Sequence, residues 1–414
     1  MNTPKPGWYF GWNIVAAATF VTLLSSGLRL GFGPFFLPLT QDLGFSRSAL
    51  AAIVAVGMLV YGLAMPVAGH LVARIGTRGV LLLGCATVLV ASAWTVMARG
   101  WWPFMLSFGV LLSVGLSFTS TVALTPIISR WFTRQRGMAL FFLSTGAMAG
   151  MAVMTPVLAH SIAAVGWRTT LMGFAAVLVL TTVPLALWVM RENAPAETDQ
   201  GSAAKAASQA AASPAPNATL RTALTTAPFW QVALGLFACG YSMNLLGAHG
   251  VPMLMDHGFD ATTSAHGVGL IGLVAIGGTL LLGRIADRTP RRNLLAVIYG
   301  VRGLGFFALV MVGVEWELYT AAAIGGIVWA GSIALSSAIL ADVYGVRLVG
   351  LLYGLCFLAH QIGGAISSWL GGWGYETYGT HWLSFGSAGA ILLLAAVVSL
   401  QLPVRQPLVA APAR

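Results

Sequence analysis

The chain has 414 residues, of which 58% are hydrophobic and only 8% are charged, and its formal net charge is +10. So few polar side chains cannot coat a soluble globule, so the composition excludes a soluble protein and predicts an integral membrane protein. The three cysteines, Cys85, Cys239 and Cys356, lie far apart in apolar stretches without metal-ligand spacing, and we interpret them as packing residues.

Twelve apolar stretches follow one another along the chain, each of about the 20 residues that a helix needs to cross a bilayer. The predicted fold class is therefore an all-α membrane protein with twelve transmembrane helices in two pseudo-symmetric six-helix bundles. The first stretch exceeds the core of a signal peptide and has no small-residue cleavage site after it, so we expect a retained helix. The predicted spans are 9–39, 47–72, 79–98, 102–127, 137–160, 168–190, 229–254, 262–286, 293–313, 318–341, 350–372 and 382–402.

The composition changes between the sixth and seventh spans. Residues 192–226 are rich in Ala, Ser, Thr and Pro and cannot bury enough apolar surface to order themselves. We therefore predict an N-terminal bundle over 1–191, a cytoplasmic linker over 192–226 and a C-terminal bundle over 227–414.

The basic residues are distributed unevenly between the two sides of the predicted membrane. If the N-terminus is cytoplasmic, 16 of the 21 Lys and Arg residues lie in inside loops and at inner helix ends. This asymmetry predicts a multi-pass protein of the inner (cytoplasmic) membrane with both termini in the cytoplasm. The basic residues then serve to orient the protein in the membrane and not to bind nucleic acid. The expected partners are lipid and a small-molecule substrate, and we expect a monomer.

The two halves repeat one sequence unit. Pro38, Asp42, Gly44 and Phe45 recur at Pro252, Asp256, Gly258 and Phe259, each displaced by 214 positions (252 − 38 = 214). A duplication in an apolar chain indicates two bundles related by symmetry around a central path.

Two loops of the repeat carry a recognisable signature. The turns GHLVARIGTR and GRIADRTPRR resemble the signature of the major facilitator superfamily, and RWFTRQRGMAL and Gly166-Trp167-Arg168 resemble its other turns. The resemblance implies the superfamily fold, and it implies that these turns form a cytoplasmic gate in which an acid pairs with arginines. Two positions depart from the signature, because Ala73 stands where the first acid is usual and Pro290 replaces a glycine. The acid of the gate is therefore expected to be Asp287. Alternatively, the arginines only fix the orientation of the protein in the membrane. The candidate gate residues are Gly69, Arg74, Arg78, Gly283, Asp287 and Arg288.

Three further segments narrow the resemblance. The segments 27–33, 248–252 and 359–364 are similar to those of bacterial relatives of the oxalate:formate and monocarboxylate transporters. This resemblance implies exchange or proton-linked movement of small organic anions, which we interpret as monocarboxylates. Related carriers often have a cation in helix eight where this chain has Thr279. Transport of neutral or other small molecules therefore remains an alternative function.

The residues themselves point in the same direction. Arg29 lies well inside the first span, where a charge costs several kcal/mol unless it faces a wet cavity or a partner, so we expect it to contact an anionic substrate. Ser25 and Ser26, one turn earlier, can share its hydrogen bonding. The alternative is an arginine that snorkels outward or ties helices together. No acidic residue falls inside a predicted span, so the interior favours anions.

Other polar residues within the spans are weaker candidates. Arg302 is interpreted as structural, with its partner expected either among carbonyls or among the hydroxyls of the tenth span. His249 and His360 are candidates for proton coupling because histidine titrates near neutrality, although a satisfied packing role is the alternative for each. The regularity of the seventh span near His249 is doubtful because Gly247, Gly250 and Pro252 are close. The remaining candidates for substrate binding are Tyr241, Asn244, Trp329, Gln361 and Ser120.

No catalytic motif is present. The sequence contains no GxxxxGK[ST] loop, no HExxH and no GxSxG elbow with triad partners, so we predict neither an enzyme nor a cofactor nor a metal site. The predicted function is gradient-driven transport of small organic anions by alternating access. A non-transporting membrane receptor on the same fold is the remaining alternative.

Overall fold

The computed structural model describes residues 9–132, 135–193, 220–286, 288–345 and 349–403, and these residues form helices and no strand. Ten helical segments in this part of the chain are long and apolar enough to cross a membrane. Two of them, Arg47–Met97 and Met138–Val189, have 51 and 52 residues, about twice the length that one crossing needs. Each is broken once by a glycine with positive φ, Gly76 (φ 77°) and Gly166 (φ 78°). The ten segments therefore provide twelve crossings, which confirms the predicted fold class.

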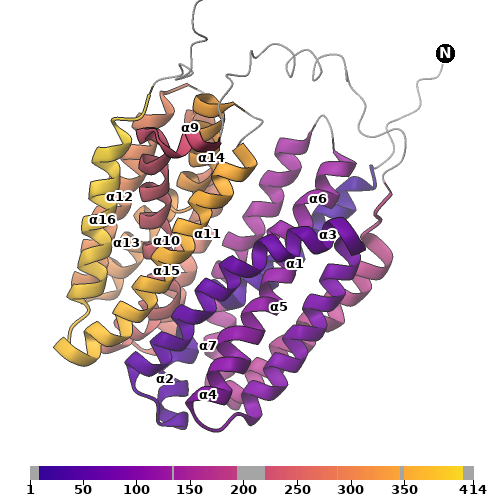
Figure 1. Ribbon diagram of the computed structural model, residues 1–414. Helices are drawn as coiled ribbons and strands as arrows, with labels where there is room; N and C mark the ends of the chain where they lie inside the picture. The colour runs from indigo at the N-terminus through magenta and orange to yellow at the C-terminus, as the bar shows by residue number, and fades with distance from the viewer. Residues whose placement is uncertain (1–8, 133–134, 194–219, 287, 346–348, 404–414) are drawn as a thin grey trace, which may run out of the picture.

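The first six crossings form the N-terminal bundle, drawn in indigo to magenta in Figure 1. Its helices are α1 (Gly11–Leu30), α2 (Gly33–Leu43), α3 (Arg47–Met97), α4 (Trp101–Phe104), the π-helix η1 (Met105–Leu112), α5 (Ser113–Phe118), α6 (Thr121–Trp131), α7 (Arg136–Pro184) and the π-helix η2 (Leu185–Val189).

The last six crossings form the C-terminal bundle, which lies beside the first (Figure 1). A short helix, α9 (Leu220–Leu224), precedes it and lies in the end of the predicted linker. The bundle consists of α10 (Ala227–Asp256), α11 (Ala261–Ala286), α12 (Arg291–Met311), α13 (Glu315–Ile327), α14 (Gly331–Tyr344), α15 (Val349–Tyr378), the π-helix η3 (Trp382–Gly386) and α16 (Ser387–Ser399). We call the end that carries α9 the linker face, and the end that carries α2 and α4 the opposite face.

Three crossings are interrupted in the middle, which the sequence did not predict. The first crossing breaks at Gly31 and continues as α2, the fourth breaks between α5 and α6, and the tenth breaks between α13 and α14. A break frees backbone carbonyls that must be satisfied within the protein. The Ser25 hydroxyl donates to the carbonyl of Thr119 at 3.0 Å, and the guanidinium of Arg302 donates to the carbonyl of Trp329 at 3.2 Å. Ser25 therefore seals a helix break instead of bonding to Arg29.

The seventh crossing, in contrast, is one continuous helix. α10 runs unbroken through Pro252, so the doubt about its regularity was unfounded.

The two bundles meet through α3 against α15, α7 against α11, and α10 against α1 and α2. Small residues let the backbones come close, as expected where lipid supplies no hydrophobic drive for association. A Cβ atom added to Gly272 of α11 would lie 2.7 Å from the Met148 carbonyl of α7, and one added to Gly247 would lie 2.9 Å from the Leu30 carbonyl. Backbone therefore packs on backbone across the interface.

Gly150 provides a test of this packing within the N-terminal bundle. A Cβ atom at this position would clash with the Leu23 carbonyl and lie 2.9 Å from the Gly27 nitrogen of α1. We expect Gly150→Ala to lower the unfolding temperature of the purified protein in detergent, because overpacking costs about 1–3 kcal/mol. The control is Gly173→Ala in the same helix, where nothing lies within 4 Å. Alanine should leave stability unchanged there or raise it by up to about 1 kcal/mol. Equal effects of the two substitutions would contradict this account.

Candidate functional site

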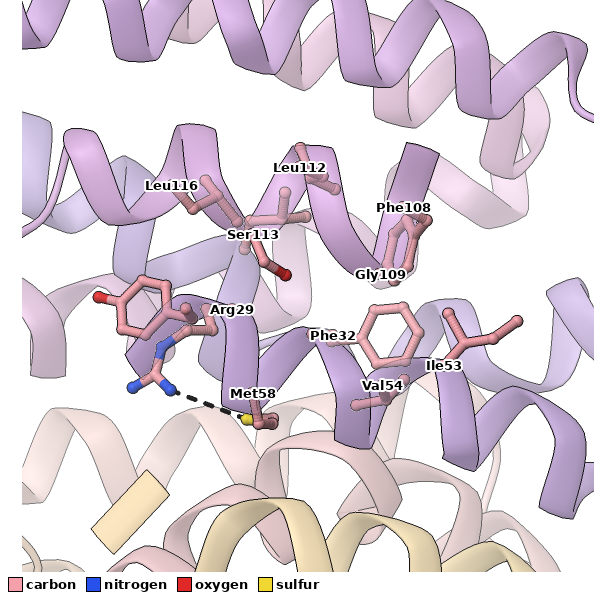
Figure 2. A pocket seen from close by; sticks show the side chains of 13 residues that line it. Arg29, Phe32, Ile53, Val54, Met58, Phe108, Gly109, Leu112, Ser113 and Leu116 are labelled. Atoms are coloured by element: carbon pink, nitrogen blue, oxygen red, sulfur yellow. Dashed lines mark hydrogen bonds between the residues drawn. The ribbon is translucent and has the colours of Figure 1, made fainter. Parts of the chain in front are cut away.

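A pocket lies in the N-terminal bundle between α1, α3, η1 and α5. It contains about 490 Å³ of empty space, including its opening, and no acidic side chain lines it. Figure 2 shows Arg29 and Met58 toward one side of this space and Phe32, Ile53 and Phe108 toward the other. The lining residues are Leu28, Arg29, Phe32, Ile53, Val54, Gly57, Met58, Tyr61, Phe108, Gly109, Leu112, Ser113 and Leu116. The pocket is thus mainly apolar with one cationic side.

The pocket lies near the middle of the membrane-spanning part. Tyr61 is 14 residues from the start of α3 at Arg47 (61 − 47 = 14), which corresponds to about 21 Å along a helix. The first limb of α3 ends at Gly76, about as far beyond Tyr61. One wall is the π-helix η1, a conformation that occurs often at functional sites.

Arg29 occupies the last turn of α1, where the free carbonyls of a helix end favour a cation. Its Nη1 donates to Oδ1 of Asn244 at 3.1 Å and lies 3.9 Å from the Met58 sulfur. The centre of its guanidinium lies 4.6 Å from the centroid of the Tyr61 ring, in cation–π geometry. Because Asn244 belongs to α10, Arg29 connects the two bundles beside the pocket.

One edge of the Arg29 guanidinium forms no hydrogen bond with the described residues. Nη1 is engaged by Asn244, whereas Nε is buried without a hydrogen-bond partner, and Nη2 forms no hydrogen bond within the described residues. Nε and Nη2 form the side of a guanidinium that can pair with both oxygens of a carboxylate. A buried donor without a partner is costly, so this edge is suited to an anionic ligand.

Gln361 and His360 of α15 extend the polar contacts from the pocket. Gln361 donates from Nε2 to the Met58 carbonyl at 3.3 Å, and its Oε1 lies 3.0 Å from Nδ1 of His360. Both side chains are buried, and Nε2 of His360 has no hydrogen-bond partner. The structure thus brings four predicted residues together, Arg29, Asn244, Gln361 and His360.

The other four predicted substrate-binding residues lie elsewhere. The Tyr241 hydroxyl pairs with Ser387 of α16 at 2.8 Å, and Nε2 of His249 lies 2.7 Å from the Ser368 carbonyl. Ser120 caps the start of α6, where its oxygen accepts from the Val122 nitrogen at 3.3 Å. Trp329 is buried against Arg302 within the C-terminal bundle. Each of these side chains, except for the unpartnered indole nitrogen of Trp329, has a partner that accounts for it.

Arg302 is 1% exposed and has no acidic partner among the described residues. Its guanidinium lies 4.1 Å from the centroid of the Trp329 ring and donates to the Trp329 carbonyl, so its partner is a carbonyl and not a hydroxyl of the tenth span. It also donates to the sulfur of Cys239 at 3.4 Å, and Ser332 donates to the same sulfur at 3.3 Å. Cys239 is therefore a hydrogen-bond acceptor as well as a packing residue.

Sequence reasoning missed the aromatic and sulfur groups around Arg29. Tyr61 and Met58 lie on one face of α3, three residues apart, and both contact the guanidinium. The available signal was weak, because a tyrosine and a methionine in an apolar span are usual packing residues.

The opposite face is closed by contacts between the bundles. Arg47 of α3 pairs with both carboxylate oxygens of Asp256 at 2.5 and 2.9 Å, and Nε2 of His381 lies 2.9 Å from the same carboxylate. The Ser48 nitrogen donates to Glu376 of α15 at 2.8 Å. Next to these residues, burial and the nearby His381 lower the pKa of His257. We call Arg47, Asp256 and His381 the opposite-face latch.

The linker face is arranged differently, because the ion pairs that the described residues form there lie on one side of the bundle interface. Arg130 pairs with Glu192 at 2.8 Å in the N-terminal bundle, and Arg291 pairs with Asp342 at 2.5 Å in the C-terminal bundle. Glu192 also accepts from the backbone nitrogen of Arg78 at 3.1 Å. This carboxylate, which the sequence analysis did not single out, holds the turn in which Ala73 replaces the usual acid.

The remaining predicted gate residues lie close to this surface. The side chains of Arg74, Arg78 and Arg288 are exposed. Gly69 and Gly283 lie in α3 and α11 one to two turns before the ends of the crossings. Asp287 lies outside the described residues, so the expected latch through its carboxylate stays a prediction.

Comparison with known proteins places the chain among membrane carriers. Residues 15–316 match the family model described as Major Facilitator Superfamily. Monocarboxylate transporter 11 of Homo sapiens is 29% identical over 420 residues, and the alignment covers 98% of this chain and 85% of that protein. The oxalate:formate antiporter of Oxalobacter formigenes is 22% identical over 387 residues, and the alignment covers 90% of this chain and 88% of that protein. The crystal structure of a D-xylose-proton symporter superposes with a TM-score of 0.73 at 14% identity, covering 97% of this chain and 100% of that one. The last likeness concerns the fold alone.

The opposite-face latch can be tested against a matched ion pair. Asp42 also accepts from an arginine, Arg168, and from Trp167, but all three belong to the N-terminal bundle. We expect Asp256→Asn to lengthen the distance between spin labels placed on α3 and α10 at the opposite face, because the contact between the bundles is weakened. Asp42→Asn should leave the distance unchanged. An unchanged distance in Asp256→Asn would show that the latch does not hold the bundles together.

Proposed function

Since the chain belongs to the Major Facilitator Superfamily, a family of transporters and not of enzymes, we propose that it is a secondary active transporter of small organic anions, most specifically of monocarboxylates. The observation that carries the proposal is the free Nε–Nη2 edge of Arg29 beside a pocket without acidic side chains. The similarity to a monocarboxylate transporter and to an oxalate:formate antiporter supports the same class of substrate.

The shape of the pocket supports a substrate with one charged end. Apart from Arg29, the Tyr61 hydroxyl and the Ser113 hydroxyl, its lining is apolar. A carboxylate on Arg29 would direct the rest of the molecule toward Phe32, Ile53 and Phe108 (Figure 2). Burying an apolar tail there contributes about 0.8 kcal/mol per CH₂ group, whereas a second carboxylate would be desolvated without a partner. The proposal therefore favours monocarboxylates with a short apolar tail over dicarboxylates.

The mechanism that follows is alternating access by rocking of the bundles 1–191 and 227–414 about the Arg29–Asn244 contact. The opposite-face latch closes one side, whereas the ion pairs that the described residues form at the linker face do not join the bundles and would let that side open. We propose that the linker face is cytoplasmic, in agreement with the distribution of basic residues, and that the protein acts as a monomer in the inner membrane.

Proton coupling is proposed at His360 rather than at His249, although both were candidates. His360 contacts Gln361, which reaches Met58 beside Arg29, and its Nε2 forms no hydrogen bond within the described part of the chain. His249 contacts the Ser368 carbonyl through Nε2 and packs against the Phe36 ring at 4.7 Å between centroids, which is the contact of a packing residue. Protonation of His360 would rearrange the contact with Gln361 at the bundle interface.

Arg29→Gln is the first test, because it removes the charge and keeps an amide of similar reach. We expect uptake of a radiolabelled monocarboxylate into proteoliposomes to fall by at least tenfold. Arg29→Lys should retain part of the activity, since it keeps the charge and loses the bidentate edge.

The matched control is Arg168→Gln, which removes an exposed arginine at the opposite face of the same bundle. It should leave uptake close to that of the unchanged protein. Unchanged carboxylate uptake in Arg29→Gln would refute the assignment, and stabilisation of the protein by neutral compounds alone would favour the alternative of a carrier of neutral molecules.

His360→Ala and His249→Ala separate the two proton-coupling candidates. We expect His360→Ala to abolish the stimulation of uptake by an inward proton gradient while substrate exchange at equal pH continues. His249→Ala should retain the stimulation. Full proton dependence in His360→Ala would exclude this residue from coupling.

A further inference from the structure

Two histidines face each other across the bundle interface, outside the site described above. His160 lies in the first limb of α7 and His266 lies near the start of α11, so they belong to different bundles. Their ring centroids are 5.6 Å apart and both side chains are exposed. From this geometry we infer a binding site for a divalent transition-metal ion, such as Zn²⁺, that joins the two bundles through His160 and His266.

The separation of the rings fits one shared metal ion. A zinc–nitrogen bond of about 2.1 Å places the metal about 3.2 Å from the centroid of an imidazole ring, and two rings at a tetrahedral angle then have centroids about 5.2 Å apart. The observed 5.6 Å requires only a slightly wider angle or a small rotation of either side chain. Imidazole nitrogen is a preferred ligand of Zn²⁺.

His160 is already oriented as a metal ligand. Its Nδ1 lies 2.8 Å from the Pro156 carbonyl, so this nitrogen carries the proton and Nε2 keeps its lone pair. A ligating histidine in metalloproteins usually donates its other ring N–H to a carbonyl or carboxylate in this way, which fixes the tautomer and the ring orientation. The site therefore has a ligand whose second nitrogen is supported by the backbone.

The backbones below the two histidines are held close together. A Cβ atom at Gly269 of α11 would lie 3.0 Å from the Ala152 carbonyl of α7 and 3.2 Å from the Pro156 ring. Pro156 has no N–H to offer that carbonyl, which is four residues earlier in the helix. The same proline thus shapes the helix contact and orients His160, so little has to move when a metal binds.

The site is a two-ligand site completed by water. No group of three or more His, Cys, Asp or Glu lies together within the described residues, so a closed structural metal site is not what we infer. His160 is six residues before the break of α7 at Gly166, and His266 is five residues after the start of α11, which places both about 8–9 Å from helix ends at the opposite face. A metal ion there holds this face closed and stops the bundles from rocking.

A second pair of histidines serves as an internal comparison. His257 and His381 have ring centroids 6.2 Å apart, but Nε2 of His381 is bound to Asp256. Both belong to the C-terminal bundle, so a metal bound between them would not join the bundles. Variants of this pair distinguish a cross-bundle site from binding of metal to neighbouring histidines of a single bundle.

The test uses the purified full chain without an affinity tag, and Zn²⁺ alone as the probe. Zn²⁺ should raise the unfolding temperature of the unchanged protein, because a ligand of the folded state stabilises it. His160→Gln and His266→Gln should each remove this rise as completely as the double variant does, since one ion needs both ligands. His70→Gln, which removes an exposed histidine of α3, and His257→Gln should retain it.

Inhibition of transport provides the second readout. The concentration of Zn²⁺ that halves uptake should increase at least tenfold in His160→Gln and in His266→Gln, while uptake without Zn²⁺ stays unchanged. An equal rise in unfolding temperature in the double variant, or no rise in the unchanged protein, would overturn the inference. The thermal measurement needs no substrate, so its outcome is independent of the proposed transport of monocarboxylates.

Discussion

The structure depends on how two arginines are accommodated in a membrane-spanning interior where no carboxylate of the described residues lies at their depth. A guanidinium does not lose its proton in a protein, so each charge must be satisfied where it lies. Arg302 is held entirely within its own bundle, by the Trp329 ring and carbonyl and by Cys239. Nε is buried without a hydrogen-bond partner among the described residues in both arginines, but only the guanidinium of Arg29 lines the pocket, where Asn244 engages one of its other nitrogens. Arg302 therefore supports the C-terminal bundle, whereas Arg29 leaves a place for a ligand.

The contacts at the helix breaks follow from the same need to satisfy polar groups inside the membrane. In the middle of a bilayer a freed carbonyl costs several kcal/mol unless the protein provides a donor. Ser25 provides it for the fourth crossing and Arg302 for the tenth, so equivalent breaks in the two halves are sealed by unrelated side chains. This explains why polar residues that look functional in an apolar sequence can be structural.

The opposite-face latch combines a contact that is repeated in both halves with one that is not. Asp42 and Asp256 are equivalent in the repeat, as are Arg168 and His381 (381 − 168 = 213), and in each half the aspartate contacts its equivalent partner. The symmetry fails at Arg47, because the position 214 residues later is Ala261. Arg47 therefore adds a contact from the N-terminal bundle to Asp256 alone, and this difference turns an intrabundle pair into a connection between bundles.

The sequence by itself determined the twelve crossings, the two bundles and the family, because the length of apolar runs and the turns of the repeat are local properties. It also identified Arg29 as a cation within the first span and expected carbonyls or hydroxyls of the tenth span around Arg302. Tertiary structure alone decided which polar residues gather beside the pocket: Asn244 and Gln361 contact Arg29 and Met58, whereas Tyr241, His249 and Ser120 have partners elsewhere. The reason is geometric, since helical periodicity places a residue on a face of its own helix, while the packing of the two bundles decides what that face meets.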